Sequence, residues 1–155
     1  MQEPTNGGGL ASDLRRERDR FFEALSKVPP QSMTTPGPMG EWSAAEMIAH
    51  LGYWTGHAVE AIHAVEQGRI EPDAPDTDAV NETVARVARS TDLATVRRRE
   101  AASFEVLIER LDAMDPALLS VELPEGDTLL DAVRADGASH YREHADALRS
   151  KTAAP

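Results

Sequence analysis

The chain has 155 residues, a net charge of −11 at pH 7 and no cysteine. This length suits one domain with a single hydrophobic core. The excess of acidic residues argues against nucleic acid and against an anionic membrane as partners, because both are bound through clustered Lys and Arg. The lack of cysteine excludes disulfides, thiolate metal ligands and a cysteine nucleophile. The polar N-terminal segment lacks the apolar core of a signal peptide and no apolar run is long enough to cross a bilayer, so we expect a cytoplasmic protein.

The first predicted helix spans 12–28. Apolar residues recur on one side of this segment, and charged residues occupy the other side. Pro29 and Pro30 follow directly and end the helix, because proline disfavours helical geometry in the residue before it. The stretch 31–41 holds further prolines and glycines and is predicted to be a loop.

The second predicted helix has the clearest start signal in the chain. Ser43 is followed three residues later by Glu46, which is the spacing of a capping box. The helix extends to Gln67, and Gly68 is its stop signal. After a proline-containing linker, residues 78–89 are predicted to form a short helix.

The third long helix is predicted from Ser90 or Thr91 to Met114. The fourth is predicted to begin with Asp127 as its N-cap and to continue to Arg149 without interruption. Four amphipathic helices joined by loops predict an all-α fold, an antiparallel four-helix bundle. The sequence contains no alternating strand pattern that would favour a sheet.

The predicted bundle occupies residues 11–150 as one domain. The polar segments 1–10 and 151–155 flank it and are predicted to be flexible tails.

Three histidines fall on the inward faces of two predicted helices. His140 and His144 are spaced i, i+4, which puts both imidazoles on one side of a helix, one turn apart. His50 lies on the inward face of the second helix. Three imidazoles with an open fourth position are typical of a catalytic zinc site or a similar divalent metal site. The alternative is that the histidines are structural core residues.

Further residues near these faces are candidates for proton transfer. His57 lies two helical turns from His50, about 10 Å along the axis, which is too far to share one ion. It is therefore a candidate for moving a proton, together with Tyr53 and Tyr141.

A second group of residues is predicted to bind substrate. Trp54 faces the same side as the histidine of its helix, although a core role is the alternative. Gly137 is unusual in a helix interior and leaves room for a ligand or a neighbouring helix. Arg97 and Glu100 interrupt the apolar stripe of the third helix; they either face substrate or form a local ion pair at the bundle rim.

The chain resembles the DinB-like (YfiT-like) superfamily of small four-helix bundles. The resemblance rests on WSAAEMIAHLGYW and on SHYREHADALR near the end of the chain. The segment AVNETVAR, followed by a long helix, is similar to the branch that includes the colibactin self-protection (ClbS-like) proteins. The resemblance implies one divalent metal ion held by His50, His140 and His144. It also implies a homodimer, and thiol-dependent transferases, metal-dependent hydrolases and self-resistance proteins as relatives.

These observations favour a metal-dependent enzyme that acts on a small organic electrophile, by hydrolysis or thiol transfer, in detoxification or self-resistance. Zinc is the expected ion, with nickel, iron or manganese as alternatives. Because the chain has no cysteine, a thiol nucleophile would come from a cofactor such as mycothiol or bacillithiol. The alternative is a non-catalytic bundle that binds or sequesters a small molecule or serves in a stress response.

Overall fold

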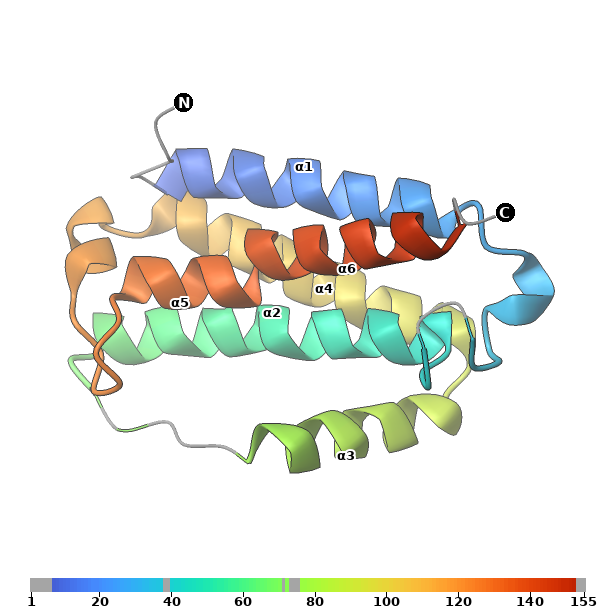
Figure 1. The fold of residues 1–155 in the computed structure, drawn as a ribbon. Helices are drawn as coiled ribbons and strands as arrows, with labels where there is room; N and C mark the ends of the chain where they lie inside the picture. Colours follow the sequence, from blue (N-terminus) through green and yellow to red (C-terminus); the bar gives the residue numbers. More distant parts are fainter. Residues whose placement is uncertain (1–6, 38–39, 71, 73–75, 153–155) are drawn as a thin grey trace.

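The computed structural model describes residues 7–37, 40–70, 72 and 76–152. It is all-helical in these residues, apart from two isolated β-bridges in loops. Short 3₁₀ turns cover Pro30–Ser32 and Pro116–Ser120. The helices follow in the order α1 Gly7–Leu25, α2 Ala44–Glu66, α3 Thr77–Arg89, α4 Leu93–Ala113, α5 Leu129–Asp136 and α6 Ala138–Thr152 (Figure 1).

The predicted helical bundle is confirmed. Helix α1 packs on α4 and α6, while α2 packs on α4 and α5, and these elements surround one core. Helix α3 packs on α2 and lies outside the bundle (Figure 1). It runs back along α2, so that α4 begins at the same end of the bundle as α2. As a result α2 and α4 run in the same direction, opposite to α1, α5 and α6. No helix in the described part of the chain has both the length and the apolar character to span a membrane.

The capping box at the start of α2 forms as predicted. The Ser43 hydroxyl accepts a hydrogen bond from the Glu46 backbone N–H at 3.2 Å, and the Glu46 carboxylate accepts one from the Ser43 N–H at 3.4 Å. Both groups are buried, so the box fixes where the helix enters the core. Helix α2 is thereby positioned to present the inward face that carries His50.

The predicted N-terminal tail is too long. Helix α1 begins at Gly7, because Leu10 and Ala11 bury their side chains in the core and extend the apolar stripe by one turn. Residues 7–10 therefore belong to the bundle. At the other end α6 continues to Thr152, past the predicted boundary. The remainder of the two predicted tails lies outside the described residues.

The predicted fourth helix is not continuous, and this prediction is wrong at Gly137. Gly137 has φ −107° and ψ −110°, which ends α5, and α6 starts at the next residue. A Cβ at Gly137 would lie 2.8 Å from the Val133 carbonyl oxygen. The N-cap of α5 is Thr128 rather than Asp127, since Thr128 and Asp131 form a second capping box. The break lets α5 pack on α2 while α6 packs on α1.

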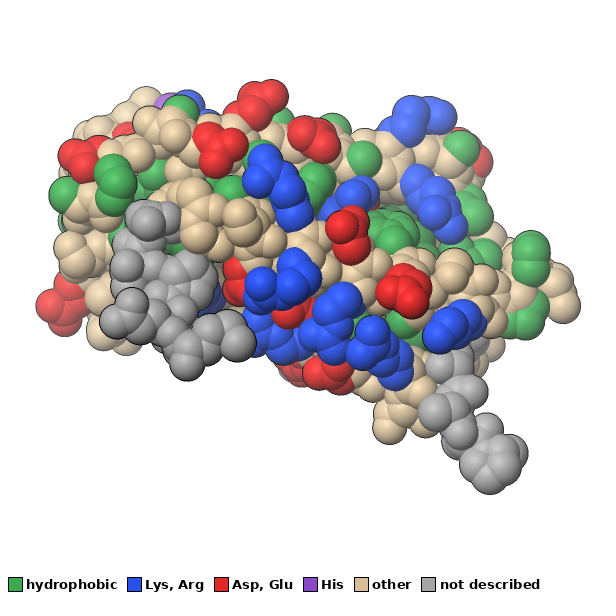
Figure 2. All heavy atoms as spheres, turned by 90° about the horizontal axis from the view of Figure 1, so that it is seen from above, with side chains coloured by type: hydrophobic (Ala, Val, Ile, Leu, Met, Phe, Trp, Pro, Cys, Tyr) green, Lys and Arg blue, Asp and Glu red, His purple; other side chains and the backbone are tan. Residues whose placement is uncertain are grey.

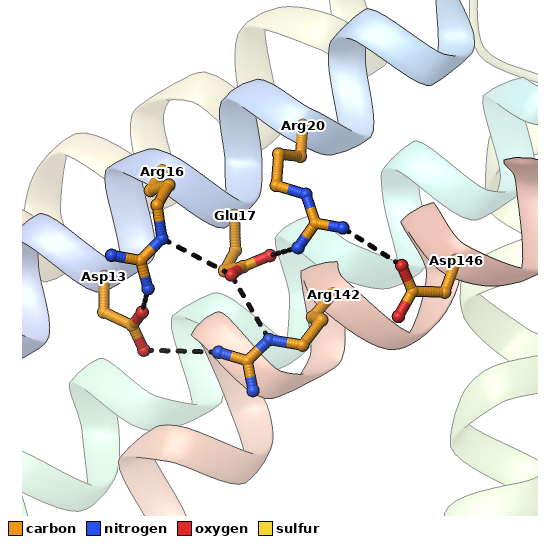
Figure 3. Close-up of polar contacts among 6 residues, drawn as sticks. All are labelled: Asp13, Arg16, Glu17, Arg20, Arg142 and Asp146. Atoms are coloured by element: carbon orange, nitrogen blue, oxygen red, sulfur yellow. Dashed lines mark hydrogen bonds and ion pairs between the residues drawn. The ribbon is translucent and has the colours of Figure 1, made fainter. Parts of the chain in front are cut away.

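Ion pairs join α6 to α1 along one side of the bundle. Glu17 is only 3% exposed, and it pairs with Arg20 at 2.9 Å and with Arg142 at 3.2 Å. On the face seen from the side of α1, Lys and Arg side chains lie among Asp and Glu (Figure 2). Because buried Glu17 needs both partners, this network holds α6 in one register against α1. Figure 3 shows the six side chains involved: Asp13, Arg16, Glu17, Arg20, Arg142 and Asp146.

Candidate metal centre

The three predicted histidines converge inside the bundle. His50 comes from the second turn of α2, and His140 and His144 come from the first two turns of α6. One ring nitrogen from each lies within 4.8 Å of the others. The Nε2 atoms of His50 and His140 are 2.8 Å apart. The fold therefore assembles from two helices the set of three imidazoles that the sequence predicted.

The spacing of these nitrogens fits a small divalent cation. A tetrahedral ion with metal–nitrogen distances of about 2.0–2.1 Å needs ligand nitrogens about 3.3 Å apart. The shortest contact, 2.8 Å, and the outer limit, 4.8 Å, bracket that value. The donor set, three imidazoles without a thiolate, is the chemistry that suits zinc, nickel and iron.

Burial keeps these histidines in the form that binds metal. Desolvation, and next charge repulsion from the neighbouring histidines, lower the pKa of His50 to about 4 and the pKa of His140 to about 3. Burial also lowers the pKa of His144. The three imidazoles are therefore neutral at pH 7, and a cation does not have to displace protons from them.

In chelator-treated protein we expect the free energy of unfolding to fall as the pH drops from about 6.5 towards 4. An unfolded histidine has a pKa of about 6.5, above the values of about 4 and about 3 for His50 and His140 in the folded chain. In that window the unfolded chain binds more protons, so this stability is present above pH 6.5 and is lost on acidification, by on the order of 2 kcal/mol. Thermal denaturation between pH 7.5 and 4.5 measures it. The free energy of unfolding of His140→Asn should fall less steeply with decreasing pH than that of the wild type. Equal slopes would show that His140 is not a source of this pH dependence.

Trp42 lies against the cluster, and Trp54 lies one turn beyond His50 on α2. The Trp42 ring lies 4.9 Å from the His50 ring, measured between centroids. Trp54, one turn beyond His50, is 8% exposed, and its indole N–H donates to the Asn81 side-chain oxygen at 2.9 Å. Asn81 comes from α3, so the outer helix fixes the orientation of Trp54. The sequence pointed to Trp54 as a site residue and to Trp42 only as part of the motif WSAAEMIAHLGYW, and it gave no sign of Asn81, because contacts of a loop residue and of an outer helix have no local signal.

Tyr141 and Glu100 belong to a buried polar network. The Tyr141 hydroxyl donates to Glu100 at 2.6 Å, and Arg18 donates two hydrogen bonds to the same carboxylate at 2.7 and 2.8 Å. Burial, and next the Glu100 charge, raise the pKa of Tyr141 far above its ordinary value. The Tyr141 proton is thus held in the core, against a role in proton transfer. Glu100 is 1% exposed and pairs with Arg18 across the bundle, so it lies in the core rather than at the rim.

The remaining predicted site residues are more dispersed. Tyr53 is 42% exposed on the outer side of α2. Arg97 is exposed on α4, with its guanidinium 6.0 Å from the Phe22 ring centroid. Gly137 is buried at the break between α5 and α6, where a Cβ would lie 2.8 Å from the Val133 carbonyl oxygen and next to Leu14 and Leu107 of neighbouring helices. The structure therefore assigns Gly137 to packing at this point rather than to an open substrate surface.

His57 is paired with a carboxylate that sequence reasoning did not select. Its Nδ1 lies 2.6 Å from the Asp136 carboxylate, across the contact between α2 and α5. The Trp54 and His57 ring centroids are 5.0 Å apart. A carboxylate on Nδ1 orients the imidazole, which is a common arrangement for a proton-transferring histidine. Asp136 shares a helical face with His140, and this was the signal available in the sequence.

Comparisons with solved structures find the same fold in several proteins. The colibactin self-resistance protein ClbS, solved in complex with double-stranded DNA, superposes with a TM-score of 0.81, 15% identity and coverage of 99% of both chains. An uncharacterised protein from Escherichia coli UTI89 superposes with a TM-score of 0.79 and 14% identity, and the match covers 95% of this chain and 92% of that chain. An uncharacterised protein from Clostridium difficile 630 superposes with a TM-score of 0.75 and 10% identity, and the match covers 95% of both chains. A search of curated protein sequences found no match.

The ClbS structure corrects one prediction. Net charge was taken to exclude nucleic acid as a partner, and this inference is wrong, because a protein of the same fold was solved with double-stranded DNA. The overall charge of a chain does not report how charge is distributed over one face. The homodimer implied by the resemblance stays a prediction. Residues 13–146 match the family model of the DinB superfamily, and the chain therefore belongs to that superfamily.

Proposed function

We propose that this protein is a metal-dependent enzyme that acts on a small organic electrophile, by hydrolysis or by transfer of a thiol. The observation that carries the proposal is the convergence of three neutral imidazoles within 4.8 Å, one buried (His50) and two half-buried (His140 and His144). Burying three imidazoles side by side costs desolvation energy that apolar residues would avoid. A bound cation would offset that cost by giving each ring a strong partner.

The residues around the cluster have separable roles in this proposal. His50, His140 and His144 would hold a divalent ion, which as a Lewis acid lowers the pKa of a water or thiol at its open position. Trp42 would limit the access of bulk water to the cluster, because its ring lies 4.9 Å from the His50 ring, measured between centroids. His57, oriented by Asp136, is placed to accept or return a proton at its ring.

A thiol-dependent reaction requires a thiol from outside the chain, because the chain contains no cysteine. We propose a low-molecular-weight thiol such as mycothiol or bacillithiol for that case. A role in detoxification or self-resistance is supported by analogy only, through the fold shared with ClbS, a colibactin self-resistance protein. Zinc is the proposed ion, and nickel, iron and manganese suit the same donors.

A turnover assay tests the proposal. Untagged protein, either zinc-loaded or chelator-treated, is incubated with an epoxide such as styrene oxide or with 1-chloro-2,4-dinitrobenzene, with and without mycothiol or bacillithiol. We expect chelation to lower the rate at least about a hundredfold, since Lewis-acid activation supplies several kcal/mol. Turnover without thiol identifies hydrolysis, and turnover only with thiol identifies transfer. Saturable binding of the electrophile with no turnover in any combination would contradict the enzyme proposal and would instead indicate a sequestering protein.

A further inference from the structure

A cavity of about 500 Å³ lies beside the second half of α2, outside the histidine cluster. Its walls come from α2 and the residues just after it, from the first residue of α3, from α5 and from the loop 121–128 that precedes α5. None of the three clustered histidines lines it. Figure 1 shows this loop folding over the end of α2 where the helix finishes. The volume is that of a pocket for a small molecule.

The loop wall of the cavity is ordered by its own hydrogen bonds. The Leu123 N–H donates to the Asp127 carbonyl at 2.8 Å, and the Leu129 N–H donates to the Val121 carbonyl at 2.9 Å. Gly126 has φ +100°, which a side chain would disfavour, and so permits the tight reversal. The cavity is therefore bounded by rigid backbone on one side and by helices on the other.

The lining combines apolar surface with an excess of negative charge. Apolar side chains from α2 and the loop form much of the wall, and Trp54 contributes an aromatic ring. One arginine, Arg69, lines the cavity, and its guanidinium donates to the Gln67 side chain at 2.9 Å. Against it stand four carboxylates: Glu60, Glu125, Asp127 and Asp136.

Asp136 occupies a position that helix stability does not explain. It is the last residue of α5, where the negative end of the helix dipole disfavours an anion. Its carboxylate is instead held by His57 at 2.6 Å, at the wall of the cavity. His57 in turn lies against Trp54, with ring centroids 5.0 Å apart. A carboxylate, an imidazole and an indole thus meet at one side of the same cavity.

We propose that this cavity binds a small organic ammonium ion with an apolar body. The carboxylates attract the cation, Asp136 accepts a hydrogen bond from the ammonium group, and Trp54 faces it with an electron-rich ring. The apolar body packs on Leu123, Ile70 and Val65. An anion of equal size is repelled by the excess of carboxylates. The inference requires neither a metal nor turnover, so it stands or falls separately from the proposed function.

Isothermal titration calorimetry with three ligands of similar size tests the charge preference. Benzylammonium, benzyl alcohol and phenylacetate are titrated into zinc-loaded and chelator-treated wild-type protein. We expect benzylammonium to bind both forms, at least about tenfold more tightly than benzyl alcohol, with phenylacetate weakest. Equal affinity for phenylacetate and benzylammonium would overturn the proposal. Binding only to the zinc-loaded form would place the ligand at the metal and would overturn it as well.

Matched charge variants locate the binding site. Asp136→Asn is expected to weaken benzylammonium binding at least about fivefold, because the hydrogen bond from the ammonium group loses its charged acceptor. Asp112→Asn removes the same charge from exposed α4, outside the cavity, and should leave affinity within about twofold. Glu60→Gln tests a second wall carboxylate without touching the His57 pair, and it should weaken binding about two- to threefold even where Asp136→Asn does not fold. If Asp136→Asn and Glu60→Gln bind benzylammonium as tightly as Asp112→Asn does, the cavity is not the binding site.

Discussion

His144→Ala is expected to lower the affinity of the protein for zinc at least about a hundredfold while the bundle stays folded. Loss of one of three imidazole ligands costs more than the 10–100-fold typical of losing a residue that only supports a ligand. The fold should survive, because the core of α6 rests on Tyr141, Ala145 and Leu148, all fully buried, rather than on His144. Metal content is measured after dialysis against limiting zinc, and helicity is measured by circular dichroism.

His63→Ala is the matched control for this experiment. His63 lies on α2 but outside the cluster of three histidines, so its replacement should leave metal content at that of wild type. Equal zinc occupancy in wild type and in His144→Ala would show that the ligands lie elsewhere. The metal-dependent enzyme would then lose the observation on which it rests.

Glu100→Ala is expected to destabilise the protein by about 3–5 kcal/mol. The change removes the carboxylate that accepts two hydrogen bonds from Arg18 and one from Tyr141. It leaves Arg18 between the rings of Phe22 and Phe104, with no partner of opposite charge replacing the one lost. Breaking a buried pair by removing one partner costs this amount because the other charge stays desolvated. Urea denaturation measures the loss.

A second ion pair between the same two helices provides the control. Arg15 and Asp112 also join α1 to α4, but they lie 3.8 Å apart and both side chains are about half exposed. Asp112→Ala should therefore change the free energy of unfolding by no more than about 0.5 kcal/mol. A loss below about 1 kcal/mol for Glu100→Ala would mean that the buried network does not hold α1 against α4. Loss of metal in this variant without loss of stability would instead link the network to the histidine cluster.

Local signals in the sequence were sufficient for most of the helices. The Ser43–Glu46 capping box, the proline pair after α1 and the glycine after α2 each act within a few residues, so their effects do not depend on the rest of the fold. The i, i+4 spacing of His140 and His144 likewise fixed their common face, because helical geometry alone sets it. His50 joined them by its inward position on a second amphipathic helix.

The tertiary structure decided which residues pair across helices. Arg18 and Glu100 are 82 positions apart, and His57 and Asp136 are 79 positions apart, so no periodicity connects them. Glu100 was predicted to face substrate or to form an ion pair at the rim, because a charged residue in an apolar stripe is compatible with either role until its partner is known.

The sequence by itself determined the helices, their inward faces and the three histidines, since these follow from capping, period and spacing along one chain. Only the tertiary structure decided the break at Gly137, because a glycine inside a helical pattern is compatible with a continuous helix. Here the segments before and after it pack on different helices, and the helix is interrupted between them. That break sends α5 to α2 and α6 to α1. It thereby brings Asp136 to His57 and His140 to His50, two contacts that depend on how four helices share one core.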